Sequence, residues 1–206
     1  EGGAELINSN AYNIGAWPWE LPHWPTSFTQ VHEFVDEIWA QSRFVSSVFQ
    51  RITDKPVIQM PIAVEIPAPL NYSRDRFNFS KSDFLFLLMF DGYSWLSRKN
   101  PLTSVQAFVK AFPFNTSGVG LVIKAMNVNN TDPQWQAILS LIANDPRVII
   151  INEKIPRQGL IDLMACCDAY ISLHRSEGFG RVIAEAMLLG KPTIATNFSG
   201  NVDFCN

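Results

Sequence analysis

The chain has 206 residues, of which 47% are hydrophobic and 17% are charged, so it can bury the core of one full domain and part of another. Its formal net charge of −3 at pH 7 argues against a dedicated nucleic-acid-binding protein. No run of about 18 or more apolar residues occurs, so the sequence predicts no transmembrane segment.

The first 70 residues predict part of an α/β domain followed by a linker. Ser42 is expected to cap a helix that runs to about Arg51. Residues 17–25 contain too many prolines for regular structure. Short apolar runs predict three strands, at residues 6–9, 37–40 and 57–60.

From Ser82 onward, strand and helix patterns alternate regularly. Apolar runs predict five strands, at residues 84–90, 119–123, 148–151, 169–173 and 193–196. Amphipathic patterns predict four helices, at residues 101–112, 133–143, 157–166 and 179–189. This alternation predicts an α/β fold with a Rossmann-like, doubly wound parallel sheet, whose ligand-binding residues lie at the carboxyl ends of the strands.

The three cysteines do not suggest a disulfide framework. Cys166 and Cys167 are adjacent, the number of cysteines is odd, and no C-x-x-C pair occurs. We therefore expect a reduced, cytoplasmic setting, which is compatible with peripheral attachment to the inner face of a membrane. Five N-x-[S/T] sequences are interpreted as chance occurrences in that setting. Both ends look cut, because the chain lacks an initiator Met and stops directly after a predicted strand.

Residues 176–187, SEGFGRVIAEAM, are the most informative stretch of the chain. Gly178, Phe179 and Gly180 form a turn between a buried strand and the start of a helix. A helix N-terminus leaves about four amides unpaired and carries roughly half a positive charge. An anionic oxygen or a sugar hydroxyl is therefore a suitable ligand. The alternative is a glycine turn that only connects the strand to the helix.

Two glutamates bracket this turn. Glu185 lies in a helix that is apolar almost all round, so its carboxylate is expected to be buried and must be paired or protonated. It could accept hydrogen bonds from ribose hydroxyls, or form an ion pair with Arg181 or Lys191. Glu177 could bind a hexose hydroxyl, or it could interact only with the helix dipole.

Basic residues are predicted at the same edge of the sheet. Arg98 and Lys99 follow the first strand of the alternating region, and two cations there could neutralise a diphosphate, although such a pair can also be a solvated loop. His174 and Arg175 follow a later strand and could meet phosphate, and the histidine could instead be structural. Lys124, at the end of the second strand, is a weaker candidate for a third phosphate-binding cation.

Other chemistries find little support in the sequence. It contains no Walker A motif, no G-x-S-x-G elbow and no D-x-D pair, and its three histidines are scattered. A dinucleotide fingerprint is not completed, because Ile183 occupies its third small-residue position. We expect no metal ion and no cofactor.

Taken together, these residues resemble the bacterial, retaining GT-B glycosyltransferases of family four. Three segments carry the resemblance: the E-x7-E motif in SEGFGRVIAEAM, the stretch FDGYSWLSRKNPLTSVQAFVKAF, and GKPTIATNFSGNVDF. The resemblance implies that residues 71–206 are the nucleotide-sugar-binding domain, the C-terminal half of a GT-B fold, incomplete at its end. Residues 1–70 would be a remnant of the N-terminal acceptor-side domain with its linker.

The resemblance also implies an activity. The protein would transfer a sugar from a UDP or GDP donor to a glycan, a lipid or another acceptor, with retention and without a metal ion. This piece, truncated at both ends, would bind donor weakly, would not catalyse transfer, and could self-associate through its truncated face. Trp17, Trp19, Trp24 and Phe28 either flank the acceptor cleft or pack in a core. The alternatives are a degenerate, non-catalytic module and a nucleotide-sugar epimerase of the same fold.

Site roles follow from the same resemblance. Arg98 and Lys99 would hold the diphosphate and stabilise the leaving nucleotide, and Glu177 would hold the transferred sugar. The remaining donor-binding residues would be Gly178, Phe179 and Gly180 at the sugar, Glu185 at the ribose, Asn152 near the base, and His174, Arg175 and Lys124.

Overall fold

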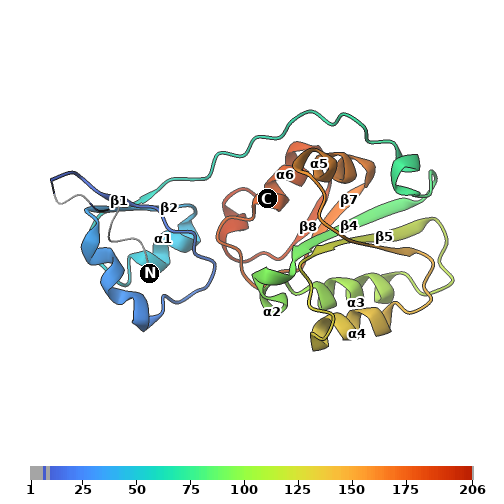
Figure 1. Ribbon diagram of the computed structural model, residues 1–206, viewed down its shortest axis with the longest axis horizontal. Helices are drawn as coiled ribbons and strands as arrows, with labels where there is room; N and C mark the ends of the chain where they lie inside the picture. The colour runs from blue at the N-terminus through green and yellow to red at the C-terminus, as the bar shows by residue number, and fades with distance from the viewer. Residues whose placement is uncertain (1–6, 8–9, 206) are drawn as a thin grey trace. The chain divides into compact units, whose positions relative to one another are not determined.

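The computed structural model describes residue 7 and residues 10–205 (Figure 1). It divides into two compact units. Unit 1 comprises Glu1–Ala63, Ser176–Arg181 and Asn197–Asn206, and unit 2 comprises Val64–Arg175 and Val182–Thr196. Every strand pair is parallel in both units, which confirms the predicted Rossmann-like α/β fold with part of a second α/β domain.

Unit 2 contains a five-stranded parallel sheet in the order β6-β5-β4-β7-β8. The bounds of its strands are β4 Phe84–Asp91, β5 Val119–Met126, β6 Val148–Asn152, β7 Ala169–Ser172 and β8 Thr193–Ala195. The first strand of the unit, β4, therefore lies between β5 and β7. Strands β5 and β6 are added on one side of β4 and strands β7 and β8 on the other, so the strand order reverses between β4 and β7. In doubly wound sheets this switch point is where ligands bind.

Helices cover both faces of that sheet, with α3 and α4 on one face and α5 and α6 on the other (Figure 1). Their bounds are α3 Pro101–Ala111, α4 Pro133–Leu141, α5 Arg157–Cys166 and α6 Arg181–Leu188. Helix α4 begins at a proline, and the Asp132 side chain accepts hydrogen bonds from two first-turn amides. Such a cap satisfies donors that the helix itself leaves unpaired.

The apolar core of unit 2 lies between the sheet and helices α3 and α4. Val105 and Phe108 of α3 and Ile138 of α4 are at most 2% exposed and pack against β4 and β5. Their spacing follows the helical period, so each helix buries one face. The amphipathic patterns at residues 101–112 and 133–143 therefore predicted both helices correctly as elements with one apolar face.

Unit 1 contains a smaller parallel sheet in the order β1-β2-β3. Its strands are β1 Ile14–Gly15, β2 Glu37–Ala40 and β3 Val57–Gln59, with a 3-10 helix at Thr26–Phe34 and helix α1 at Arg43–Phe49. Ser42 caps α1, as predicted, because its side chain accepts a hydrogen bond from Val45 N. The strand predicted at residues 6–9 lies outside the described residues, apart from Ile7.

Several elements differ from the sequence prediction, and three of these differences concern predicted site residues. Helix α6 begins at Arg181 rather than at residue 179, because Gly180 has a φ of 93° and cannot be helical. Arg98 and Lys99 lie in a short helix, α2 (Leu96–Lys99), rather than in a loop. Strand β5 continues three residues past its predicted end, through the buried Lys124.

Among the described residues, no helix has the length and apolar character needed to cross a bilayer. The three cysteines are all free thiols. Burial raises the pKa of Cys166 to about 11 and that of Cys167 to about 12. Both thiols are therefore protonated at neutral pH and unreactive as nucleophiles.

Candidate functional site

The predicted site residues divide between the two units. Arg98, Lys99, Lys124, Asn152, His174, Arg175 and Glu185 lie in unit 2, whereas Glu177, Gly178, Phe179 and Gly180 lie in unit 1.

In unit 2, the loops after β4 and β7 meet at the switch point of the sheet. The backbone N–H of Arg175 donates to the carbonyl of Arg98 at 2.8 Å, and Asn100 Nδ2 donates to the carbonyl of Leu173 at 2.8 Å. The structure therefore brings together two basic segments that lie more than 70 residues apart in the sequence. Arg98 is buried, Lys99 is half-buried and Arg175 is exposed.

Residues with positive φ flank the single helical turn Leu96–Lys99 (α2, the Arg98-Lys99 turn). Trp95 has a φ of 55° and Asn100 has a φ of 52°, one on each side of α2. Asparagine adopts this left-handed conformation readily at the end of a helix, whereas a positive φ is a clear outlier for a residue as bulky as tryptophan. Such strain is found most often at functional sites, where the surrounding structure maintains it.

Lys124 lies where β5 approaches its carboxyl end, but its ammonium group is already engaged. The side chain is 2% exposed, and Nζ donates to the carbonyls of Ala125 and Glu153 at 2.7 Å each. Burial lowers the pKa of Lys124, and the charges of Glu153 and Asp91 oppose that effect. The lysine joins the end of β5 to the segment after β6, and two of its three donors are used in doing so.

His174 is also held within its own loop. The ring is 1% exposed, and Nδ1 lies 3.0 Å from Ser172 Oγ and 3.1 Å from the carbonyl of Ser172. These contacts fix the ring at the end of β7 and agree with the structural alternative for this histidine. Asn152, the last residue of β6, is exposed at the same edge of the sheet.

Glu185 has a partner that the sequence analysis missed. Its side chain is 3% exposed, and the Arg157 guanidinium binds both carboxylate oxygens, with Nη1–Oε2 and Nη2–Oε1 distances of 2.9 Å. Arg157 is the first residue of α5, and its side chain is 47% exposed. The ion-pair alternative is therefore correct in kind, but the pair joins α5 to α6, and Lys191 instead donates to the carbonyl of Ala165 at 2.8 Å.

The pair between Arg157 and Glu185 is directional as well as charged. Each oxygen of the Glu185 carboxylate accepts a hydrogen bond from a different guanidinium nitrogen. Planar bidentate pairing also fixes the plane of the carboxylate. No signal in the sequence marks Arg157, because it lies 28 residues before Glu185 and on a different helix.

In unit 1, the glycine turn is held by its neighbours. The backbone N–H of Glu177 donates to Ser199 Oγ at 2.8 Å, and its carbonyl accepts from Gly200 N at 2.9 Å. Ser42 Oγ donates to the carbonyl of Gly178 at 2.5 Å. Glu177 is 7% exposed, so this part of the E-x7-E segment is well ordered and largely buried within unit 1.

The tryptophan cluster packs against the core of unit 1. Trp17 and Trp24 contact Phe49 with ring centroids 6.0 and 5.2 Å apart, and Trp19 contacts Trp24 at 4.6 Å. Phe28 contacts Trp24 at 6.3 Å and remains 52% exposed. This arrangement agrees with core packing, the second of the two alternatives for this cluster.

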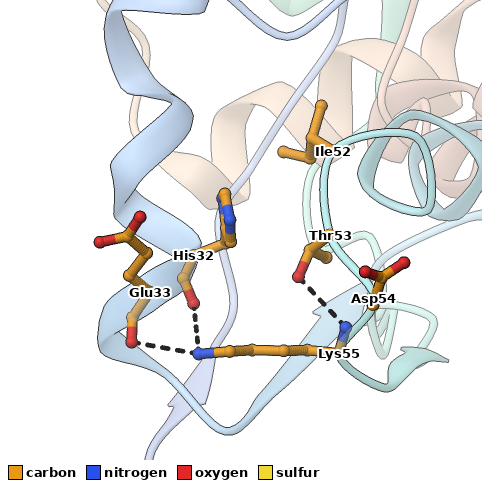
Figure 2. Close-up of a pocket in the computed structure, with 6 residues that line it drawn as sticks. All are labelled: His32, Glu33, Ile52, Thr53, Asp54 and Lys55. Carbon is orange, nitrogen blue, oxygen red and sulfur yellow. Dashed lines mark hydrogen bonds between the residues drawn. The ribbon is translucent and has the colours of Figure 1, made fainter.

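Unit 1 also has a pocket of about 470 Å³ that none of the predicted site residues lines (Figure 2). Its walls are formed by His32, Glu33, Ile52, Thr53, Asp54 and Lys55. Lys55 Nζ donates to the carbonyls of His32, Glu33 and Val35, at 2.9, 3.1 and 2.5 Å (Figure 2 shows the first two). The ammonium group therefore satisfies carbonyls at the end of the 3-10 helix Thr26–Phe34.

Within the described part of the chain, no group of three or more His, Cys, Asp or Glu side chains is arranged to hold a metal ion.

A protein-family model matches part of the chain. The family model described as "Glycosyl transferases group 1" matches residues 141–206, a region that includes the whole E-x7-E segment. A search of curated proteins found no match.

Several solved structures share the fold. A glycosyltransferase from Rickettsia africae is 20% identical, with a TM-score of 0.73 over 96% of this chain and 55% of that one. HepE from Anabaena, solved in complex with UDP and glucose, is 19% identical, with a TM-score of 0.68 over 96% of this chain and 56% of that one. A structure described as trehalose-6-phosphate from Escherichia coli, bound with UDP-2-fluoro glucose, is 13% identical, with a TM-score of 0.64 over 84% of this chain and 49% of that one.

The chain therefore spans about half the length of the structures that it matches. At these identities the likeness shows a common fold, the GT-B type, and the family match adds sequence similarity over the last third of the chain.

Proposed function

We propose that this chain is the nucleotide-sugar-binding part of a glycosyltransferase that transfers a sugar from a nucleoside diphosphate donor to an acceptor. The observation that carries the proposal is the family match over residues 141–206. That region contains both glutamates of the E-x7-E segment. Two structural neighbours were solved with UDP or with a UDP-sugar, which makes UDP the first nucleotide to test.

In the proposed site, Arg98 and Lys99 bind the diphosphate and stabilise the departing nucleotide. The convergence of Arg98 and Arg175 at the switch point of the sheet supports this assignment. Glu177 and the Gly178–Gly180 backbone bind the transferred sugar, and Glu185 accepts hydrogen bonds from the ribose. Leaving-group stabilisation and orientation supply the rate, with no side-chain nucleophile assigned.

The proposal includes retention of the anomeric configuration and independence from metal ions, both of which rest on the family resemblance. The product formed by the protein that contains this chain should have the same anomeric configuration as the donor. Addition of EDTA should leave the rate unchanged. Conversion of the donor into its epimer without an acceptor would favour the epimerase alternative instead.

Thermal unfolding of the 206-residue chain with UDP, GDP, UDP-glucose and GDP-mannose tests donor binding. At a ligand concentration 100 times Kd, binding stabilises a protein by about 2.7 kcal/mol, which corresponds to about 5–10 °C in Tm for a chain of this size. Lys99→Ala should weaken binding about tenfold, because a charge-assisted contact to phosphate is lost. Lys110→Ala, an exposed lysine at the end of α3, is the matched control and should bind normally.

No Tm change with any of these ligands would contradict the proposal. Equal losses of affinity in Lys99→Ala and Lys110→Ala would instead reject the assignment of the diphosphate to the Arg98-Lys99 turn.

A further inference from the structure

The glycine turn of the E-x7-E segment is clamped by three separate parts of unit 1. Ser176 Oγ donates to the carbonyl of Glu20, from the proline-rich segment. Ser42, between β2 and α1, donates to the carbonyl of Gly178 at 2.5 Å. Gly200 N donates to the carbonyl of Glu177 at 2.9 Å.

The clamp leaves no space for side chains at two glycines. A Cβ atom added at Gly178 would overlap Gln41 Nε2 and the carbonyl oxygen of Trp19, and one added at Gly200 would overlap the carbonyl of Gly178. The backbones of the turn and of the clamp are therefore in direct contact. Such close approach is a common reason for glycine at a position.

Two of these hydrogen bonds also fix the direction of backbone amides in the turn. A carbonyl and the next N–H belong to one planar trans peptide group and point in opposite directions. The bond from Ser42 to the carbonyl of Gly178 therefore sets the direction of the Phe179 N–H. The bond from Gly200 to the carbonyl of Glu177 does the same for the Gly178 N–H, so both amides point away from the groups that hold the carbonyls.

The single hydroxyl of Ser42 has two structural tasks. Its Oγ accepts from Val45 N at 3.2 Å, which caps α1, and donates its proton to the carbonyl of Gly178. The residue is 0% exposed, so water cannot replace either bond. A hydroxyl has one donor, and here it is committed to the turn.

We propose that Ser42 is a positioning residue for the sugar subsite. By holding the carbonyl of Gly178, it orients the turn whose backbone and Glu177 recognise the transferred sugar, without being assigned a contact to the sugar itself. This inference rests on the proposed function. It predicts that the loss of the Ser42 donor weakens recognition of the sugar and spares recognition of the nucleotide.

Substitutions at Ser42 can separate the two tasks. Ser42→Asp keeps an acceptor for the α1 cap and removes the donor to Gly178, whereas Ser42→Ala removes both. Ser42→Thr keeps both groups and is the conservative rescue. Ser47→Ala is the matched control, because Ser47 lies in the same helix and its hydroxyl donates to the carbonyl of Phe44, not to the turn.

The experiment is calorimetric titration of each variant of the full chain with UDP and with UDP-glucose, and with GDP and GDP-mannose if the UDP pair does not bind. The quantity compared is the ratio of the nucleotide Kd to the nucleotide-sugar Kd. We expect Ser42→Asp and Ser42→Ala to lower this ratio at least fivefold while the nucleotide Kd changes less than twofold. Ser42→Thr and Ser47→Ala should keep the wild-type ratio.

Three outcomes would overturn the inference. If Ser42→Asp keeps the wild-type ratio, Ser42 acts only as a helix cap. If the nucleotide Kd and the nucleotide-sugar Kd rise equally, its effect is on the fold rather than on the subsite. If the wild-type chain binds neither nucleotide nor nucleotide sugar, the proposed function fails as well, and this result is distinct from normal binding with an unchanged ratio.

Discussion

At the scale of single residues, Glu185 and Arg157 show how a buried charge is accommodated in this fold. The Glu185 carboxylate lies in an apolar helix with a side chain that is 3% exposed, and the Arg157 guanidinium binds both of its oxygens. A buried carboxylate without a partner is costly, so Arg157 compensates the burial of Glu185, and the pair links α5 to α6. The pair also sets the plane of the Glu185 carboxylate.

Arg157→Met should destabilise the chain by about 1–3 kcal/mol, because the substitution leaves a buried carboxylate without its charged partner. The free energy of unfolding in urea measures this loss. Arg51→Met, an exposed arginine in unit 1, is the control and should change stability by less than about 0.5 kcal/mol. Equal stability of Arg157→Met and the wild type would show that the pair contributes nothing to the fold.

At the scale of the elements, Arg147 fixes the turn that leads from α4 into β6. Its guanidinium binds both oxygens of Asp145, with Nε–Oδ1 and Nη2–Oδ2 distances of 2.9 and 2.6 Å, and donates to the carbonyls of Phe112 and Pro113. The hydrogen bonds from Arg147 lower the pKa of Asp145, although burial opposes this effect. One arginine thereby joins the end of α3 to the start of β6.

This cluster predicts a specific dependence of stability on pH. Because the pKa of Asp145 is lower in the folded chain, its contribution is complete above the unfolded value of about 3.9 and is lost as the pH falls through the folded value. Asp145→Asn should therefore cost about 1–3 kcal/mol at pH 7 and progressively less below about pH 4. Urea unfolding of both proteins across this range measures the difference.

Asp75→Asn is the control for that experiment. Asp75 forms an ion pair with Lys81 at 3.0 Å, but both side chains are more than half exposed, so its loss should be within about 0.5 kcal/mol at any pH. A difference between Asp145→Asn and wild type that does not change with pH would contradict the assigned cause.

The elements also show which features the sequence could predict. The sequence located α5 at its observed bounds and α3 within one residue, because their apolar spacing and the proline that starts α3 are local signals. It ended β5 too early, because a lysine normally marks exposure, whereas Lys124 is buried with two carbonyl partners. It began α6 too early, because Gly-Phe-Gly is compatible with a turn or with a helix start until the φ of Gly180 is known.

The sequence predicted which segments meet at the edge of the sheet, but not the side-chain contacts that support them. Parallel topology alone indicated that the segments after β4 and β7 meet, and the bond from Arg175 N to the carbonyl of Arg98 agrees. The contacts of Ser42 with Gly178 and of Arg157 with Glu185 join residues 136 and 28 positions apart, through side chains that have no motif of their own. Pairings of that kind depend on the packed fold and leave no local pattern.

At the scale of the whole molecule, the chain contains two α/β units, each with its own parallel sheet. It covers about half the length of the solved structures that it matches. The E-x7-E segment contributes to both units, since Glu177 is counted with unit 1 and Glu185 with unit 2. The central claim is that this segment and the Arg98-Lys99 turn bind one nucleotide sugar.

Backbone amide NMR of the 206-residue chain during titration with UDP-glucose tests that claim most directly, because it reports which residues respond. We predict saturable shifts that are largest for Arg98–Asn100 and Glu177–Gly180, and that UDP alone reproduces the first set but not the second. Absence of saturable shifts, or shifts confined to the unit 1 pocket around His32 and Lys55, would contradict the account.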